Sequence, residues 1–291
     1  MNDDAPEVRE ITLNADGIPL SALLAEPRHT PSRAVVVAVH GGGMRAGYFD
    51  GRAAPGQSLL ELGARLGWTV LAVDRPGYGR SAQRLPEGQT LGEQSLTLHA
   101  GLADFATRYD TGAGFLMIAH SFGGKLALTA AADQHGVELI GLDISGCGHR
   151  YAVETAQLPT TGAHGNWRLN WGVLRLYPPN AFKLSGPLVA RVPALEAREA
   201  HTWPQRFPEI AASIRAPVRF TFAEHELWWR HNDEEIVALT GLLSSSRVVV
   251  DRLPNAGHNI SLGWAARSYH LRALAFLEEC LLERQVALSR H

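Results

Sequence analysis

The chain has 291 residues, of which 45% are hydrophobic and 19% charged, a balance that excludes a disordered or low-complexity protein. Its formal net charge of −2 gives no reason to expect nucleic acid or an anionic membrane as a partner. The opening run MNDDAPEVRE is acidic, and no stretch approaches the roughly 20 apolar residues of a membrane span. We therefore expect a cytoplasmic protein with no signal peptide and no membrane contact.

Short apolar runs alternate with helical patterns through the first half of the chain. A hairpin comes first, with strands predicted at 8–14 and 20–25 around a turn at Asp16-Gly17. Nearly all-apolar strands are then predicted at 34–40, 69–74, 114–120 and 139–144. Helices are predicted between them at 58–66, 91–109 and 121–132. Strands of this kind are typical of a parallel sheet that is covered on both faces.

The alternation stops after residue 144 and resumes at residue 217. The stretch between contains seven prolines and is expected to form short helices and turns. Beyond it, a strand is predicted at 217–223, a helix at 233–243, a strand at 247–253 and a final helix at 262–282. Strands that alternate with helices in this way predict βαβ units and a mainly parallel sheet.

Ser121 lies where a predicted strand ends and a predicted helix begins, in the run AHSFGG at residues 119–124. A serine hydroxyl becomes a nucleophile only when a base takes its proton and its oxygen stands clear of neighbouring atoms. A sharp turn from strand to helix gives that exposure, and it requires small residues two before and two after the serine. Ala119 and Gly123 occupy those positions. The alternative is a serine that only caps a helix.

A histidine and a carboxylate follow Ser121 in the chain. Of the 13 histidines, His258 is the one on a small-residue turn after the last predicted strand. Glu224 and Glu226 follow the strand predicted at 217–223 and offer two carboxylates. The order Ser121, Glu226, His258 matches the order nucleophile, acid, base of one class of catalytic triad.

On these motifs the chain resembles the alpha/beta-hydrolase superfamily from about Val8 to its end. The resemblance implies a mainly parallel, eight-stranded alpha/beta sheet with helices on both faces. It also implies a core domain of residues 1–147 and 216–291 and a helical cap, 148–215, inserted after the sixth strand. In this family the acid ends a run such as G-E-x-D, which matches Glu226. Asp143 stays open as the second candidate, because some members place the acid after the preceding strand, and Glu224 is the third.

The run HGGGM at residues 40–44 ends the first predicted core strand. Glycines let a backbone approach closely, and backbone N–H groups can stabilise an oxyanion. The resemblance assigns this role to the N–H groups of Gly42, Gly43 and Phe122. A phosphate-binding loop is disfavoured because no GxGxxG or GK[ST] run follows, and a plain flexible turn stays the alternative. The run DRPGYGRS at 74–81 matches another family motif, which implies a structural role beside this loop.

Residues 148–215 contain eight Lys or Arg and four acids, a net charge of +4. This excess predicts either a substrate with an anionic part or an ordinary solvated surface. Apolar residues near the motifs could line an acyl pocket or could form the small core of the cap. The candidates are Met44, Tyr48, Trp167, Trp171, Trp228 and Trp229.

The sequence therefore predicts a serine hydrolase that cleaves a carboxylic ester or thioester of a small acyl substrate through an acyl-enzyme on Ser121. We expect no metal or organic cofactor, and Cys147 and Cys280 are expected to be free thiols. A cofactor-free lyase, a cyclising acyltransferase and a slow-turnover ligand-binding receptor on the same scaffold stay open as alternatives.

Overall fold

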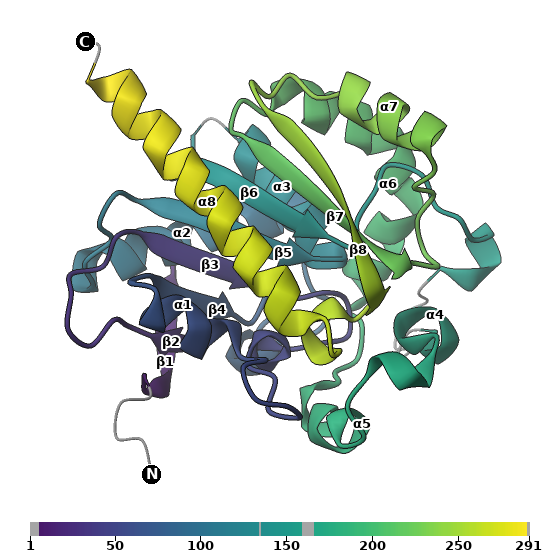
Figure 1. Ribbon diagram of the computed structural model, residues 1–291, viewed down its shortest axis with the longest axis horizontal. Coiled ribbons are helices and arrows are strands. Elements are labelled where there is room, and N and C mark those ends of the chain that lie inside the picture. Colours follow the sequence, from purple (N-terminus) through teal and green to yellow (C-terminus); the bar gives the residue numbers. More distant parts are fainter. Residues whose placement is uncertain (1–5, 134, 159–165, 290–291) are drawn as a thin grey trace.

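The computed structural model describes residues 6–133, 135–158 and 166–289. Eight strands form one sheet in the order β1-β2-β4-β3-β5-β6-β7-β8 (Figure 1). The pairs β1–β2 and β2–β4 are antiparallel, and the other neighbouring pairs are parallel. The strands are β1 Val8–Ala15, β2 Ile18–Ala25, β3 Val35–Val39, β4 Thr69–Val73, β5 Phe115–His120, β6 Leu139–Ser145, β7 Val218–His225 and β8 Val248–Gly257. The predicted eight-stranded, mainly parallel sheet is confirmed.

Helices cover both faces of the sheet. The helix α8 crosses the front of the sheet in Figure 1, whereas α2, α3 and α6 lie behind it. The α-helices are α1 Leu59–Arg65, α2 Leu91–Arg108, α3 Phe122–Ala132, α4 Trp167–Trp171, α5 Ala181–Ser185, α6 Ala194–Ser213, α7 Asp233–Gly241 and α8 Ala266–Leu288. The 3-10 helices are η1 Ala46–Phe49, η2 Gly79–Ser81, η3 Thr155–Gln157, η4 Leu174–Leu176, η5 Gly186–Leu188 and η6 Ile260–Leu262.

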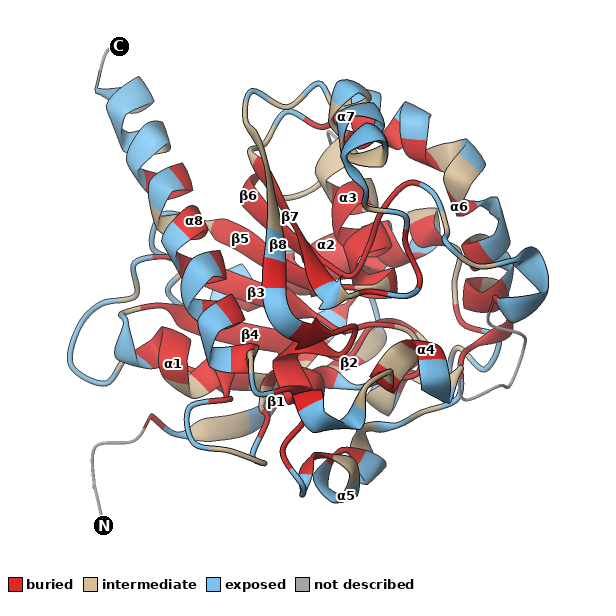
Figure 2. Cartoon of the chain, turned by 45° about the vertical axis from the view of Figure 1, so that its right-hand side comes forward, coloured by how far each residue is buried: buried red, intermediate tan, exposed pale blue. Residues whose placement is uncertain are grey.

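Two apolar clusters, one on each face of the sheet, form the core. One joins the sheet to α1 and α8, and the other joins it to α2, α3, α6 and α7. Every residue of β3, β4, β5 and β6 is buried, as the red strands of Figure 2 show. Covering on both faces explains why these strands lack polar alternation. No helix in the described part of the chain is long and apolar enough to cross a membrane.

The segment between β6 and β7 differs from its prediction. It contains η3, α4, η4, α5 and η5, as expected of short helices, but also α6, which spans 20 residues. Pro204 and Pro208 lie inside α6, where each removes a helical N–H donor and disfavours the helix by about 3 kcal/mol. The apolar side of α6 compensates, because Trp203 and Phe207 are fully buried in the cluster that includes α3.

The end of β8 also differs from its prediction. We expected the strand to stop at residue 253, but it continues to Gly257. The register with β7 shifts between Ala223 and His225, and Asn255 adopts a positive φ of 54°. This irregularity is typical of a β-bulge, which bends a strand and redirects the residues that follow it. His258 therefore follows the strand directly.

Candidate active site

Ser121 lies at the sharp turn between β5 and α3. Its φ of 54° and ψ of −118° are unusual for a residue with a side chain, and such a conformation costs about 1–3 kcal/mol. Two backbone bonds hold the turn: the Ser121 N–H donates to Ser145 at 2.8 Å, and the Gly124 N–H donates to Ser121 at 2.9 Å. A Cβ at Gly123 would lie 2.3 Å from the Val39 carbonyl oxygen, so this position requires glycine. The turn thus has the form that exposes a nucleophile.

A chain of hydrogen bonds joins Ser121 to His258 and Glu226. The Ser121 Oγ lies 3.2 Å from His258 Nε2. His258 Nδ1 lies 2.8 and 3.0 Å from the two carboxylate oxygens of Glu226. The N–H of Trp228 donates to Glu226 at 2.9 Å and holds that carboxylate in place. A carboxylate at Nδ1 keeps the proton there, which leaves Nε2 free to accept the proton of Ser121.

The two alternative acids lie elsewhere. Asp143 is fully buried in β6, where Tyr269 Oη donates to it at 2.9 Å and Arg219 Nε lies 3.0 Å away. Burial raises the pKa of Asp143 to about 6, although Arg219 opposes the shift. Glu224 accepts a hydrogen bond from the N–H of Asn255 at 2.7 Å on the surface. Among the described residues, Glu226 supplies the carboxylate that contacts His258.

The ring of His120 packs against the ring of His258. The ring centroids of His120 and His258 are 4.7 Å apart, and the ring of Tyr48 stacks on that of His120 with centroids 4.7 Å apart. Burial lowers the pKa of His120 well below its ordinary value, so this ring is neutral. We expected Tyr48 to line the pocket, but the structure buries it completely as support for His120.

The glycine-rich loop after β3 lies against the Ser121 turn. A Cβ on Gly41 would lie 3.1 Å from the Cβ of Ser121. Among the described residues, the N–H groups of Gly42 and Phe122 have no hydrogen-bond partner. Gly43, which we expected to be a further oxyanion donor, directs its N–H to the hydroxyl of Tyr78 at 3.0 Å. Two of the three expected N–H groups are therefore free to bind an oxyanion.

Comparison with known proteins identifies the family of the chain. The model of the alpha/beta hydrolase family matches residues 36–274. The chain belongs to this family. A search of the curated proteins found no matching sequence.

Solved structures share the hydrolase fold at low sequence identity. The esterase Est1E from Butyrivibrio proteoclasticus, bound to ferulic acid, is 17% identical with a TM-score of 0.63, over 94% of this chain and 99% of its own. The monoacylglycerol lipase of Paleococcus ferrophilus is 18% identical with a TM-score of 0.64, over 94% and 99%. The thioesterase domain from the curacin biosynthetic pathway is 17% identical with a TM-score of 0.61, over 91% and 99%.

Arg75 supports the glycine-rich loop of this hydrolase from behind. Its buried guanidinium donates to the carbonyl of His40 at 2.8 Å and to that of Gly41 at 3.2 Å. The Gly41 carbonyl and the Gly42 N–H belong to one planar trans peptide, so they point in opposite directions. Holding the carbonyl toward Arg75 therefore turns the Gly42 N–H away from Arg75.

Glu196 of α6 completes this support. Its two carboxylate oxygens accept from Arg75 at 2.8 and 3.0 Å, and one of them also accepts from Tyr78 Oη at 2.8 Å. All three side chains are buried. Through Arg75 and Tyr78, the run DRPGYGRS thus connects the glycine-rich loop to α6.

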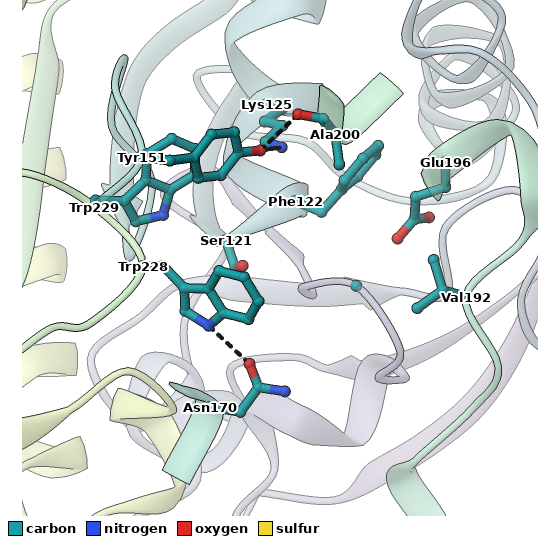
Figure 3. A pocket seen from close by; sticks show the side chains of 11 residues that line it. Ser121, Phe122, Lys125, Tyr151, Asn170, Val192, Glu196, Ala200, Trp228 and Trp229 are labelled. Atoms are coloured by element: carbon teal, nitrogen blue, oxygen red, sulfur yellow. Dashed lines mark hydrogen bonds between the residues drawn. The ribbon is translucent and has the colours of Figure 1, made fainter. Parts of the chain in front are cut away.

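A small cavity lies beside Ser121 (Figure 3), with a volume of about 60 Å³. Trp228 and Trp229 line it, as predicted. The other expected pocket residues lie elsewhere: Trp167 is 55% exposed, Trp171 packs against Tyr177 and Phe182, and Met44 and Tyr48 belong to the core.

Four polar residues line the cavity that the sequence analysis did not single out. They are Lys125, Tyr151, Asn170 and Glu196. Lys125 had a usable signal, because it follows Ser121 by four residues and residues so spaced share one helix face. Tyr151 and Asn170 come from irregular parts of the segment between β6 and β7, and Glu196 is a charged residue of α6 that a pattern of apolar residues does not mark.

Neither a metal cluster nor a disulfide occurs in the part of the chain that the structure describes. Within it, no group of three or more His, Cys, Asp or Glu side chains could hold a metal ion. Cys147 and Cys280 are both free and buried. Burial raises the pKa of each thiol to about 12, so neither is a thiolate at neutral pH.

Proposed function

We propose that this protein hydrolyses a carboxylic ester or thioester through an acyl-enzyme on Ser121. The hydrogen-bonded chain from Ser121 through His258 to Glu226 carries the proposal. Membership of the alpha/beta hydrolase family supports a hydrolase, and similar folds occur in an esterase, a lipase and a thioesterase. Residues 148–215 act as the cap in this proposal, because Asn170, Glu196 and other residues of that segment line the cavity.

The reaction begins when Ser121 Oγ attacks the carbonyl carbon and its proton passes to His258 Nε2. Glu226 holds the Nδ1 proton and stabilises the imidazolium that forms. The N–H groups of Gly42 and Phe122 bind the negative charge on the former carbonyl oxygen. His258 then protonates the leaving alcohol or thiol as its bond to the acyl carbon breaks.

Water completes the cycle by attacking the acyl-enzyme. His258 takes a proton from this water, and the ester bond to Ser121 Oγ breaks as the acid leaves. The proton returns to Ser121, so the residues end in the state in which they began. No redox step is involved.

A fluorophosphonate probe combined with an ester panel tests the proposed function. The probe is expected to label Ser121, identified by peptide mass mapping, and to abolish turnover of p-nitrophenyl esters or acyl-thioesters of varied length. Labelling of Ser121 without turnover of any ester or thioester would favour the lyase, the cyclising acyltransferase or the receptor. Failure of the probe to label Ser121 in the folded protein would contradict the assignment of Ser121 as the nucleophile.

Arg75 is expected to act as a positioning residue for the oxyanion site. In Arg75→Lys, one ammonium cannot replace a guanidinium that contacts two carbonyls and both oxygens of Glu196. We expect kcat to fall about 10- to 100-fold with little change in KM, because loss of one oxyanion donor costs roughly 100- to 1,000-fold and misalignment costs less.

Active-site titration separates this role from simple destabilisation. The kcat of Arg75→Lys is measured per fluorophosphonate-reactive site, so misfolded protein does not count. Arg206→Lys is the matched control, because Arg206 pairs with Glu199, a second carboxylate of α6, and makes no hydrogen bond to the glycine-rich loop among the described residues. An unchanged kcat per reactive site in Arg75→Lys would show that Arg75 only stabilises the fold.

A further inference from the structure

We propose that the substrate carries, besides the bond that is cleaved, a free carboxylate that the ammonium of Lys125 binds. The inference rests on the proposed function, because it names the substrate class for the same site. Lys125 follows Ser121 by one turn at the start of α3 and lines the same cavity (Figure 3). Its side chain is only 3% exposed.

The ammonium of Lys125 has no carboxylate partner. Among the described residues, its Nζ makes one hydrogen bond, to Tyr151 Oη at 2.6 Å, and no ion pair. The two nearest acids on α6 are engaged elsewhere: Glu196 binds Arg75, and Glu199 binds Arg206. The charges of both carboxylates favour the charged form of Lys125, but neither forms a hydrogen bond with Nζ, and an ammonium has three donors. This arrangement leaves the charge available to an anion that enters the cavity.

Aromatic rings surround the ammonium and hold it in place. The rings of Phe122, Tyr151, Trp203 and Trp229 lie 5.0–5.6 Å from Nζ. Such contacts stabilise a cation, but they do not cancel its charge.

Hydrogen bonds in turn fix three of these rings. Trp203 Nε1 donates to the Gly148 carbonyl at 2.8 Å, and Trp229 Nε1 donates to the Gly146 carbonyl at 2.6 Å. Tyr151 Oη donates to the carbonyl of Ala200 at 2.9 Å. Hydrogen bonds to backbone carbonyls therefore hold the positions of three rings that surround the ammonium of Lys125.

Lys125 stays charged at neutral pH. Burial lowers its pKa to about 8, which is still above 7. The chain contains only two lysines, Lys125 and Lys183, among its 27 basic residues. One of the two lies buried in the candidate active site, while Lys183 is exposed on α5. Lys183 therefore offers a matched control for every substitution at Lys125.

The substrate class that fits is a short half-ester or half-thioester of a dicarboxylic acid, or a short acyl ester of a hydroxy acid. Lys125 follows Ser121 by one helical turn and lines the same cavity, so the carboxylate has to lie close to the bond that is cleaved, which favours a short linker between them. A carboxylate fits because one ammonium neutralises one negative charge and donates hydrogen bonds to its oxygens.

Binding to the Ser121→Ala protein tests this inference without requiring turnover. Isothermal titration calorimetry compares monomethyl glutarate with its carbamoyl analogue, methyl 4-carbamoylbutanoate, which has the same shape and no charge. A second pair, 3-acetoxybenzoate and 3-acetoxybenzamide, places the carboxylate on the alcohol side. We expect the anionic member of at least one pair to bind at least about 10-fold more tightly, since a hydrogen bond between two charged groups is stronger than one to a neutral amide.

Substitution of Lys125 then attributes the preference to this residue. In Lys125→Met on the Ser121→Ala background, the affinity ratio of the preferred pair is expected to fall to about one, while Lys125→Arg retains part of it and Lys183→Met retains all of it. A ratio of about one for both pairs before any substitution at Lys125 would overturn the inference. So would a ratio that Lys125→Met leaves unchanged in protein whose circular dichroism is native.

Ester turnover tests the proposed function separately from the charge preference in binding. Wild-type protein that turns over neutral esters through Ser121 but shows no charge preference refutes only the carboxylate site. A preference that depends on Lys125 in a protein that hydrolyses no ester supports the anion site and refutes the hydrolase.

Discussion

Replacing Ser121 by alanine is expected to reduce kcat for ester hydrolysis by at least about 10⁴-fold, because loss of a triad serine typically costs up to about 10⁶-fold. The remaining rate would come from the free N–H groups of Gly42 and Phe122 and from substrate binding. The fold should stay intact, since the Ser121 Oγ makes one hydrogen bond, to His258, and alanine retains the Cβ. Steady-state kinetics on the most reactive p-nitrophenyl ester measures the effect.

Ser289→Ala, at an exposed position at the end of α8, provides the control for this experiment. It is expected to keep the wild-type kcat. Retention of more than about a tenth of the activity by Ser121→Ala, in protein free of contaminating esterase, would exclude Ser121 as the nucleophile.

Glu226→Gln is expected to lower kcat by about 10³- to 10⁴-fold. A glutamine amide can donate to Nδ1 of His258, which then places the ring proton on Nε2. Nε2 faces Ser121 at 3.2 Å, so a proton there blocks its role as a base. The measured quantity is kcat, because the lost interaction matters when the imidazolium forms and contributes little to substrate binding.

The other two candidate acids supply the comparison for Glu226. Glu224→Gln should leave kcat nearly unchanged, because Glu224 contacts the Asn255 backbone on the surface. Asp143→Asn should lower the melting temperature, because it breaks a buried contact with Arg219, but it should not lower kcat to the level of Glu226→Gln. If Asp143→Asn removed activity and Glu226→Gln did not, the acid would be Asp143.

The alternation of short apolar runs with helical patterns made most of the fold predictable from the sequence. Strands β3 to β6 are buried along their whole length, so their apolar runs mark them clearly. The carboxyl ends of parallel strands meet at one edge of a sheet, so Ser121 after β5, Glu226 after β7 and His258 after β8 could be expected to meet. The chain order of the three residues, and the position of each after a predicted strand, predicted that they would lie together.

Contacts between distant segments were not predictable in the same way. Gly43 was expected to be an oxyanion donor, but the hydroxyl of Tyr78, 35 residues away, occupies its N–H. The position of Trp171 depends on packing with Tyr177 and Phe182 inside an irregular segment. The length of α6 depends on the burial of Trp203 and Phe207, which outweighs a local preference against helix at two prolines. Each of these outcomes is set by tertiary packing.

The most direct test of the central proposal is to trap the acyl-enzyme. The protein is mixed with p-nitrophenyl acetate, quenched with acid within the first turnover, and examined by intact mass and peptide mapping. We predict one acetyl group per protein on Ser121, formed together with a burst of p-nitrophenol and lost again as turnover continues. Ester turnover with no acetyl group on Ser121, or with the acetyl group on another residue, would contradict the account.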